Sequence, residues 1–226
     1  MSYEQIVLTF RTLADKTRLR ILLLLAHQQE LSASEIADKL RLSRPNTSFH
    51  LKMLCASGLV WRRRAGAWIF HSLPSGEQKG WPRSLVRAIQ EAVRDYGVKQ
   101  LRNRQDLASA HVDQLVNALF RIATAFTNVR RLLLINRLRQ TPADGPHDLL
   151  AAVPMSLPAL SRHMAKLTSR GYLRCRPVEK GGSLRIPASF ESRVQARVLS
   201  AVSEALDRAP TRKSDTPDRG EGGRGE

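Results

Sequence analysis

The chain has 226 residues, of which 42% are hydrophobic and 5% aromatic, and its 37 lysines and arginines against 20 acidic residues give a formal net charge of +17. No apolar run reaches the roughly 18 to 20 residues of a membrane-spanning helix, and the N-terminal sequence lacks the pattern of a secretion signal. The two cysteines, Cys55 and Cys175, are far apart in the sequence. This spacing argues against a disulfide scaffold and favours a reducing, cytoplasmic location.

The excess of positive charge lies in two stretches of the chain. Residues 1–75 carry 11 basic and 5 acidic side chains, and residues 112–190 carry 12 and 4. Both stretches have regular hydrophobic patterns, so the charge does not belong to a basic tail. We therefore expect a polyanionic partner that is bound by folded surfaces.

Four helices are predicted within the first 58 residues, because apolar side chains recur at helical spacing between recognisable caps. The predicted caps are Asp15 for the second helix, a capping box of Ser32 and Glu35 for the third, and Ser43 for the fourth. Pro45 fits the first turn of the fourth helix, and Gly58 supplies the left-handed residue that ends it. The buried side of this helix is expected to contain Phe49, Leu51, Met53 and Leu54.

A β-hairpin is predicted at residues 59–73, where two short runs rich in Trp, Ile and Val are joined at 65–67. The remaining segments follow from their hydrophobic periodicity and their Gly and Pro residues. They are a loop at 74–82, a helix over 83–101, a break at 103–106, a helix over 107–125 and a closing helix over 187–208. The tail 209–226 is charge-balanced and has the composition of a disordered segment.

The sequence of residues 42–60, LSRPNTSFHLKMLCASGLV, returns as MSLPALSRHMAKLTSRGYL at residues 155–173. The repeat preserves helix caps and stops as well as apolar positions, as a duplication would. Matched pairs include Arg18 with Arg130, Ser43 with Ser156, Pro45 with Pro158, His50 with His163, and Gly58 with Gly171. We interpret residues 1–102 and 103–208 as two tandem domains, with 209–226 as a tail.

Three helices followed by a hairpin form the outline of a winged helix-turn-helix. The predicted fold class is therefore mainly α with small β-hairpin wings: two tandem winged helix-turn-helix domains joined by long helices. The first and last helices of the two domains could pair within one chain as a pseudo-dimer. In such a fold the recognition helix enters the major groove of double-stranded DNA while the wing meets the backbone.

The predicted DNA contacts of the first domain lie on its fourth helix and its wing. They are Ser43, Arg44, Asn46, Thr47, Ser48, His50, Lys52, Arg62, Arg63 and Arg64. Arg44 and Asn46 can read base edges, whereas the other side chains suit phosphates. The corresponding contacts of the second domain are Ser156, Ser161, Arg162, His163, Lys166, Lys180 and Arg185. This second set can hold phosphates but offers fewer groups for reading bases.

The stretches FRTLADKTRLRILLLL and LSRPNTSFHLKMLCASGLVWRRRAGAWIFHSL resemble the ArsR/SmtB family of bacterial winged-helix transcriptional regulators over about residues 5–73. Residues 118–186 are similar to the same family more weakly. The resemblance implies an obligate homodimer built on the first and last helices, and an effector that changes operator affinity. In this chain those dimer helices would be residues 3–14 and 83–101, with 107–125 and 188–208 as their counterparts.

Two departures from the metal-sensing members of that family bear on cofactors. Ser32 and Ser34 stand where such members often place a Cys-x-Cys, and the last helix of the first domain offers only Glu91 and Asp95. First-row metals need clustered His, Cys or carboxylate ligands. We therefore expect no metal site and no cofactor, and the sequence does not identify a small-molecule effector.

Several side chains admit two interpretations. His50 could contact a base or a phosphate, or it could form a hydrogen bond that orients the recognition helix. Trp61 and Trp68 could stack on bases, but paired strand positions more often close the small core of a wing. Cys55 and Cys175 are expected to be inert thiols, because the sequence shows no thiolate-stabilising site near them.

The sequence thus predicts a cytoplasmic, sequence-specific DNA-binding transcriptional regulator that represses by operator occlusion. An enzyme is not expected, because no nucleophile elbow, paired carboxylates or phosphate-binding Gly loop occurs. One alternative to the pseudo-dimer is a homodimer of the tandem chain. A second alternative is that the second winged helix is a protein-interaction or dimerisation module and not a DNA reader.

Overall fold

The computed structural model describes residues 1–74, 81–96, 104–107, 109–178 and 181–209. The first unit consists of α1 (Tyr3–Leu13), α2 (Lys16–His27), β1 (Leu31–Ser32), α3 (Ala33–Leu40), α4 (Arg44–Ala56), β2 (Trp61–Ala65), β3 (Trp68–Ser72) and α5 (Trp81–Asp95). After the short α6 (Arg104–Leu107), the second unit consists of α7 (Ala110–Ala125), α8 (Val129–Gln140), α9 (Pro146–Ala152), α10 (Leu157–Ser169), β4 (Arg174–Val178), β5 (Gly181–Arg185) and α11 (Arg193–Asp207). The predicted end of the helix over 83–101, Lys180 and the tail from residue 210 lie outside the described residues.

The predicted caps begin the helices of the first unit. Asp15, Ser32 and Ser43 each accept a hydrogen bond from a backbone N–H in the first turn of α2, α3 and α4, and Ser32 forms the capping box with Glu35. Gly58 follows α4 with a φ of 70°, a conformation that L side chains rarely adopt. These local signals fix where α4 starts and stops, and so which of its side chains face outward.

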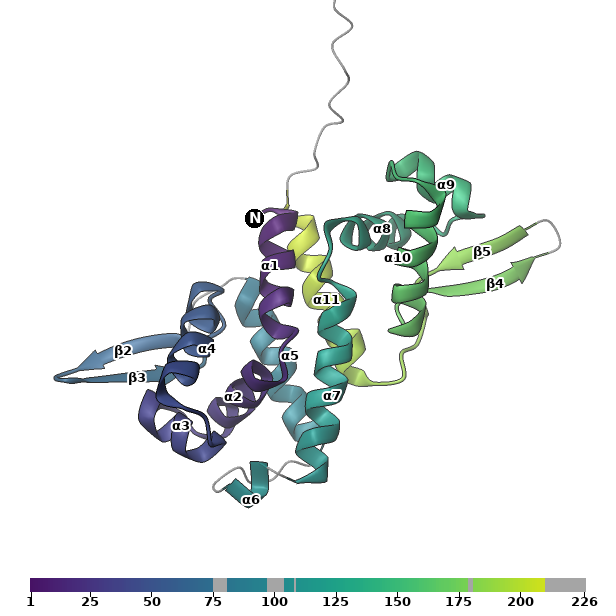
Figure 1. Ribbon diagram of the computed structural model, residues 1–226. Helices are drawn as coiled ribbons and strands as arrows, with labels where there is room; N and C mark the ends of the chain where they lie inside the picture. The colour runs from purple at the N-terminus through teal and green to yellow at the C-terminus, as the bar shows by residue number, and fades with distance from the viewer. Residues whose placement is uncertain (75–80, 97–103, 108, 179–180, 210–226) are drawn as a thin grey trace, which may run out of the picture.

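Each unit carries one antiparallel hairpin, and the two hairpins project toward opposite ends of the molecule (Figure 1). In the first unit β3 pairs with β2 and also with β1, which ties the hairpin to the strand before α3. In the second unit β4 pairs with β5, and a bridge between Ala143 and Leu184 takes the place of β1. Each hairpin is therefore anchored at its base to the helices of its own unit.

The two units match element by element. The helices α2 and α8 both have 12 residues, α4 and α10 both have 13, α5 and α11 both have 15, and each hairpin strand has five. The starts of α2 and α8 align Arg18 with Arg131, so the predicted match with Arg130 is wrong by one position. Arg18 and Arg131 each donate an Nε–H to a carbonyl oxygen near the end of the preceding helix, that of Thr12 or Ala125. This shared hydrogen bond fixes the register.

The two units share one hydrophobic core. Helix α5 packs along α11, and α1 and α2 pack against α7 (Figure 1). A row of aromatic rings crosses between the units: ring centroids are 5.6 Å apart for Trp81 and Phe10, 4.8 Å for Phe10 and Phe126, and 4.7 Å for Phe126 and Tyr172. Phe10, Phe126 and Tyr172 are at most 1% exposed. Separating the units would expose this row to water, which is unfavourable for buried aromatic surface.

Three features differ from the sequence-based expectations. Phe49 is 57% exposed, because α4 buries the side that carries Thr47, His50, Leu51 and Leu54. The expected break at 103–106 contains one short helix, α6. The closing helix begins at residue 193, where a capping box of Ser192 and Gln195 fixes its start, and not at 187. No helix of the described residues is long and apolar enough to cross a membrane.

Candidate DNA interface

The exposed side of α4 carries most of the polar side chains that were predicted to contact DNA. Arg44, Asn46, Ser48 and Lys52 are exposed, and Ser43 precedes them as an exposed cap whose Oγ accepts the N–H of Asn46 at 3.4 Å. Arg and Asn side chains have the donor geometry that reads guanine and adenine edges. The start of α4 therefore presents base-reading groups together with a helix N-terminus that favours phosphate.

Two of the predicted contacts on α4 are corrected by burial. Thr47 is 1% exposed, and its Oγ1–H donates to the Ser43 carbonyl at 3.1 Å. His50 is 8% exposed, and its Nδ1 lies 3.9 Å from Oδ1 of Asp15, the cap of α2. Thr47 bonds within the first turn of α4 and His50 faces α2, and both side chains are buried in this arrangement. The hydrogen bond that would orient the helix through His50 is not formed, because Nδ1 has no hydrogen-bond partner among the described residues.

A groove of about 620 Å³ lies between α4 and the wing. Ser48 and Lys52 line it from the helix, and Arg62 and His71 line it from the hairpin. Burial lowers the pKa of His71 below its ordinary value, and the charge of Arg62 lowers it further. The neutral imidazole therefore sits beside two cationic side chains, and the groove is positively charged without it.

The arginine triplet of the wing is divided by the alternation of side chains along β2. Arg62 and Arg64 share one side of the hairpin, which is the side of the groove, and Arg63 lies on the other. There Arg63 donates two hydrogen bonds to Glu30, at 3.0 and 2.7 Å, and its guanidinium lies 5.7 Å from the centre of the Phe70 ring. These hydrogen bonds hold the pKa of Glu30 below its usual range. Arg63 is thus paired away from α4, and its predicted phosphate contact stays a prediction.

The tryptophans of the wing do not close a core. Trp61 and Trp68 are 47% and 62% exposed, on the same side of the hairpin as Arg63. The expectation that they pack together inside the wing is wrong, because the hairpin projects beyond the helices as a single layer (Figure 1).

Helix α10 of the second unit, which matches α4 in position, carries different side chains at three of the predicted DNA-contact positions. At matching positions it has Leu157 for Arg44, Ala159 for Asn46 and Ala165 for Lys52. Leu157 is 50% exposed, and Ala159 is buried. The second unit therefore keeps the shape of a recognition helix while lacking the side chains that distinguish bases at these positions.

The predicted contacts on α10 divide into exposed and half-buried groups. Ser156, Ser161 and Arg162 are exposed, although Ser156 makes no side-chain capping hydrogen bond. His163 and Lys166 are half-buried. Burial lowers the pKa of both, and neighbouring arginines lower it further. This part of the second unit is thus densely positive.

In the second wing, the described arginines Arg174 and Arg185 lie on the side opposite to the one that carries Arg62 and Arg64 in the first wing. Cys175 stands at the position of Arg62 and shares a side with Leu184, which is 2% exposed. Arg174 and Arg185 face each other across the strands on the opposite side, and both are exposed. In the first wing, the side that corresponds to Arg174 and Arg185 is the side that bears Trp61. Arg185 therefore does not lie on the side that corresponds to the groove of the first unit, and the predicted contact of Lys180 lies outside the described residues.

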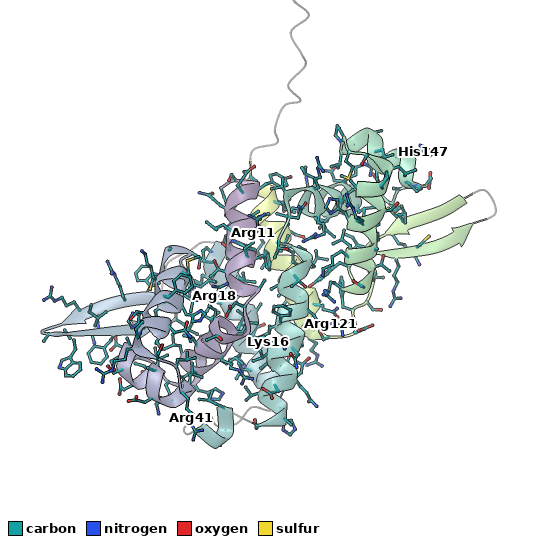
Figure 2. All side chains as sticks on the ribbon, in the orientation of Figure 1. Arg11, Lys16, Arg18, Arg41, Arg121 and His147 are labelled. Atoms are coloured by element: carbon teal, nitrogen blue, oxygen red, sulfur yellow. The ribbon has the colours of Figure 1, made fainter. Side chains whose placement is uncertain are left out.

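A basic strip between the units was not predicted from the sequence. Figure 2 shows Arg11, Lys16 and Arg121 between α4 and α10 in this view, from α1, α2 and α7. All three are exposed, and the Arg11 Nε–H crosses to the second unit to donate to the Thr127 carbonyl at 3.2 Å. The sequence does contain a hint of this strip, because Arg11 and Arg121 are cations on helices that are expected to form dimer contacts. Their meeting in one strip depends on how the units pair.

The side chains that could bind a metal ion or react as a thiolate are considered next to the predicted DNA contacts. Among the described residues, no group of three or more His, Cys, Asp or Glu side chains is placed to hold a metal ion. Ser32 uses its Oγ in the capping box with Glu35, at 2.7 Å. Burial raises the pKa of the Cys55 thiol, which disfavours a reactive thiolate.

Comparison with known proteins identifies the class of this fold. A family model described as a helix-turn-helix domain matches residues 13–62. The chain is 34% identical over 89 residues to the arsenic resistance transcriptional regulator ArsR1 of Pseudomonas putida, which covers 39% of this chain and 69% of that protein. It is 36% identical over 86 residues to the arsenical resistance operon repressor of Escherichia coli K12, covering 38% of this chain and 73% of that protein. The chain belongs to the ArsR family of helix-turn-helix transcriptional regulators.

Another relative is named as an activator of transcription. The chain is 35% identical over 86 residues to the transcriptional activator HlyU of Vibrio cholerae, covering 38% of this chain and 79% of that protein. The three relatives are named as transcriptional regulators, and none as an enzyme, which fits the prediction of a DNA-binding regulator. Each covers less than two-fifths of this ArsR-family chain, which is therefore much longer than the shared region.

Proposed function

We propose that this ArsR-family chain is a transcriptional repressor in which two winged-helix units of one polypeptide form a pseudo-dimer on DNA and act by operator occlusion. The observation that carries the proposal is the pairing of equivalent helices, α1 with α7 and α5 with α11. The family resemblance implies dimers built on the first and last helices. In this chain each of those positions is filled by a helix of the same polypeptide.

The proposal includes a tandem duplication, which similarities between the two units support. The matched helix lengths and the equivalent hydrogen bonds of Arg18 and Arg131 are what two copies of one ancestral unit would retain. The shared hydrophobic core is what a former interface between two chains would become. A single chain could then read two half-sites that differ in sequence.

Charge at the interface of the units favours the intrachain pair over a pair of first units from two chains. Arg197 of α11 lies 2.8 Å from Glu91 and 2.5 Å from Asp95, both on α5. In a symmetric pair of α5 helices, Ser84 would stand at the position of Arg197. Asp95 would then lose its cationic partner, whereas Glu91 would keep Arg87. The intrachain pair is therefore favoured by ion pairs that a symmetric pair would not make.

The oligomeric state in solution tests the pseudo-dimer. We expect light scattering of the purified full chain to give the mass of one chain, 25.3 kDa, and with DNA the mass of one chain plus one duplex. A particle of twice that mass that persists on dilution would favour the homodimer of tandem chains instead. Arg197→Glu is a useful companion variant, because it should loosen the intrachain pair and promote association between chains.

The proposed reading of bases rests on the exposed side of α4. Selection of bound sequences from a random DNA pool should return one well-defined half-site for the first unit and a weakly defined one for the second. Two equally defined half-sites in a palindrome would contradict this asymmetry. The selected duplex then serves as the operator in the experiments below.

Repression is the expected direction of regulation, because a chain seated on the major groove blocks access of other proteins. The relatives include a repressor and an activator by name, so the direction requires a direct test. In a transcription assay with the selected duplex placed over a promoter, we expect fewer transcripts as protein is added. An increase in transcripts would overturn operator occlusion.

Independence from metal is part of the proposal. The family's Cys-x-Cys position holds Ser32 and Ser34, and Ser32 serves as a cap in α3. We expect DNA affinity to be the same in a chelator and in micromolar Zn²⁺. A tenfold or larger change would show that a metal acts as effector.

A second candidate role for the second unit is the docking of another protein. Leu157 at the start of α10 is 50% exposed where α4 has Arg44, which favours an apolar contact. Leu157→Lys would disrupt such a contact while adding a charge that DNA tolerates. Loss of regulation with unchanged DNA affinity would support the docking role over the DNA role.

A further inference from the structure

Six cations gather where the second unit meets the first. Arg11, Arg130, Arg131, Arg162, Lys166 and Arg170 form this cationic cluster, around the end of α7 and the side of α10. Three of them are anchored by hydrogen bonds near the end of α7. Arg131 donates to the Ala125 carbonyl at 2.6 Å and to Thr127 Oγ1 at 2.7 Å, Arg170 donates to Thr124 Oγ1 at 2.9 Å, and Arg11 donates to the Thr127 carbonyl at 3.2 Å.

The cluster lacks the carboxylate that balances the same place in the first unit. There Asp15 caps α2, and its carboxylate lies 3.9 Å from both Arg18 and His50. In the second unit the cap of α8 is Asn128, whose Oδ1 accepts the N–H of Arg130 at 2.9 Å. Among the described residues, none of the six cations forms an ion pair with a carboxylate.

The consequence is mutual repulsion that folding does not relieve. Burial lowers the pKa of Arg131, and the charges of Arg11 and Arg170 lower it further. The pKa of His163 is lowered by burial and then by Arg131 and its neighbours, so the same charges disfavour protonation of His163. Neutral carbonyls near the helix end offset the repulsion only in part, because a helix C-terminus carries about half a negative charge.

We infer that the cationic cluster is a binding site for backbone phosphates of DNA, through which the second unit clamps the operator without reading it. This inference rests on the proposed function. Arg130 and Arg162 are exposed at the edge of the cluster and can reach a phosphate. Arg11 also belongs to the basic strip between the units, so the site continues toward α4 (Figure 2). DNA is the occupant, because the cluster lies beside a recognition helix that has lost its base-reading groups.

The sharpest test is Asn128→Asp, which gives the second unit the cap that the first unit has. Asp and Asn cap helices equally well, so the midpoint of thermal unfolding should stay the same or rise. The new carboxylate beside Arg131 should weaken binding to a fluorescein-labelled duplex of arbitrary sequence by about fivefold at low salt. Gln29→Glu, beside Glu30 in the first unit, adds the same charge away from the cluster and should leave affinity nearly unchanged.

Salt dependence separates a phosphate clamp from a structural cluster. In the double variant Arg130→Ala, Arg162→Ala, the steepness of the plot of log affinity against log salt concentration should decrease by about two. Each lost phosphate contact removes about one from it. Arg94→Ala, an exposed change in the last turn of α5, is the matched control and should keep the slope. Thermal unfolding of each variant checks that the chain stays folded.

The outcomes distinguish the two levels of the proposal. If the unaltered chain binds no duplex at any salt concentration, the proposed function fails, and the clamp fails with it. If the unaltered chain binds but Asn128→Asp and the double arginine variant keep its affinity and its slope, the clamp alone is overturned. A reduced slope in the folded double variant, with the Arg94→Ala slope unchanged, supports the clamp.

Discussion

The helices α4 and α10 have the same length and bury matching sides, yet they expose different chemistry. Two buried positions match, since Thr47 and Leu160 are both buried, as are Leu54 and Leu167, although the first pair differs in polarity. The exposed positions change freely, from Arg44 to Leu157 and from Lys52 to Ala165. Packing constrains the first kind of position in both units, whereas only a ligand constrains the second. The difference indicates that the two units are under the same demand to fold and under different demands to bind.

The largest expected effect is on the hydrophobic core that the two units share. Phe126→Ala should destabilise the chain by about 3–5 kcal/mol, because it empties the centre of the aromatic row between Phe10 and Tyr172. Urea unfolding followed by circular dichroism should shift as a single transition. The exposed Phe49→Ala is the control and should change stability by no more than about 0.5 kcal/mol. Two separate transitions, one for each unit, would contradict a common core.

The comparison of the recognition helices is tested directly at their first residues. Arg44→Ala should cost about 1–3 kcal/mol of binding to the selected operator, since a bidentate contact to a base would be lost. Leu157→Ala at the matching position of α10 should have a much smaller effect. Fluorescence anisotropy with the selected duplex measures both. Equal losses would mean that the two units read DNA alike.

A smaller difference is expected between neighbouring arginines of the first wing. Arg62→Ala should lower the salt slope of DNA binding by about one, because Arg62 lies on the side of the groove next to α4. Arg63→Ala should keep the slope, because Arg63 is paired with Glu30 on the other side. If Arg63→Ala had the larger effect, the wing would meet DNA with its tryptophan side.

The smallest expected effect is a pH dependence that only the first wing has. His71 is buried, and its pKa is lowered in the folded chain, whereas the matching residue of the second wing is Leu184. The unfolded chain therefore binds a proton more readily than the folded chain, and stability is lost as the pH falls through about 6.5 toward the lowered pKa. His71→Leu should flatten the thermal midpoint over this range. An unchanged profile would assign the acid sensitivity to other groups, such as His163.

Much of the candidate site follows from sequence, and the errors have physical causes. Arg44, Asn46, Ser48 and Lys52 were predicted and are exposed, because caps and a helical period place them on one side of α4. The triplet at 62–64 was taken as one charged patch, although strand alternation sends every second side chain to the opposite side. The alternation of side chains along a strand could have been applied to the sequence, and it would have separated Arg63 from Arg62 and Arg64.

Other errors could not be corrected from the sequence. Thr47 and His50 are polar side chains that fill buried positions by bonding to Ser43 or approaching Asp15, and only packing shows that they do so. The basic strip that includes Arg11 and Arg121 joins residues from two units, and depends on which helices pair. Such contacts are distant in the chain and leave no local pattern.

The sequence by itself determined the helices, their caps, the two hairpins and the resemblance to ArsR regulators, because these depend on residues within a few positions of one another. The tertiary structure decided which cations are available and which are already paired. It also decided that α5 lies against α11, with Arg197 between Glu91 and Asp95. The pairing of the units also brings Arg11 to the five cations of the second unit, where Asn128 stands in place of the aspartate that balances the same corner of the first unit.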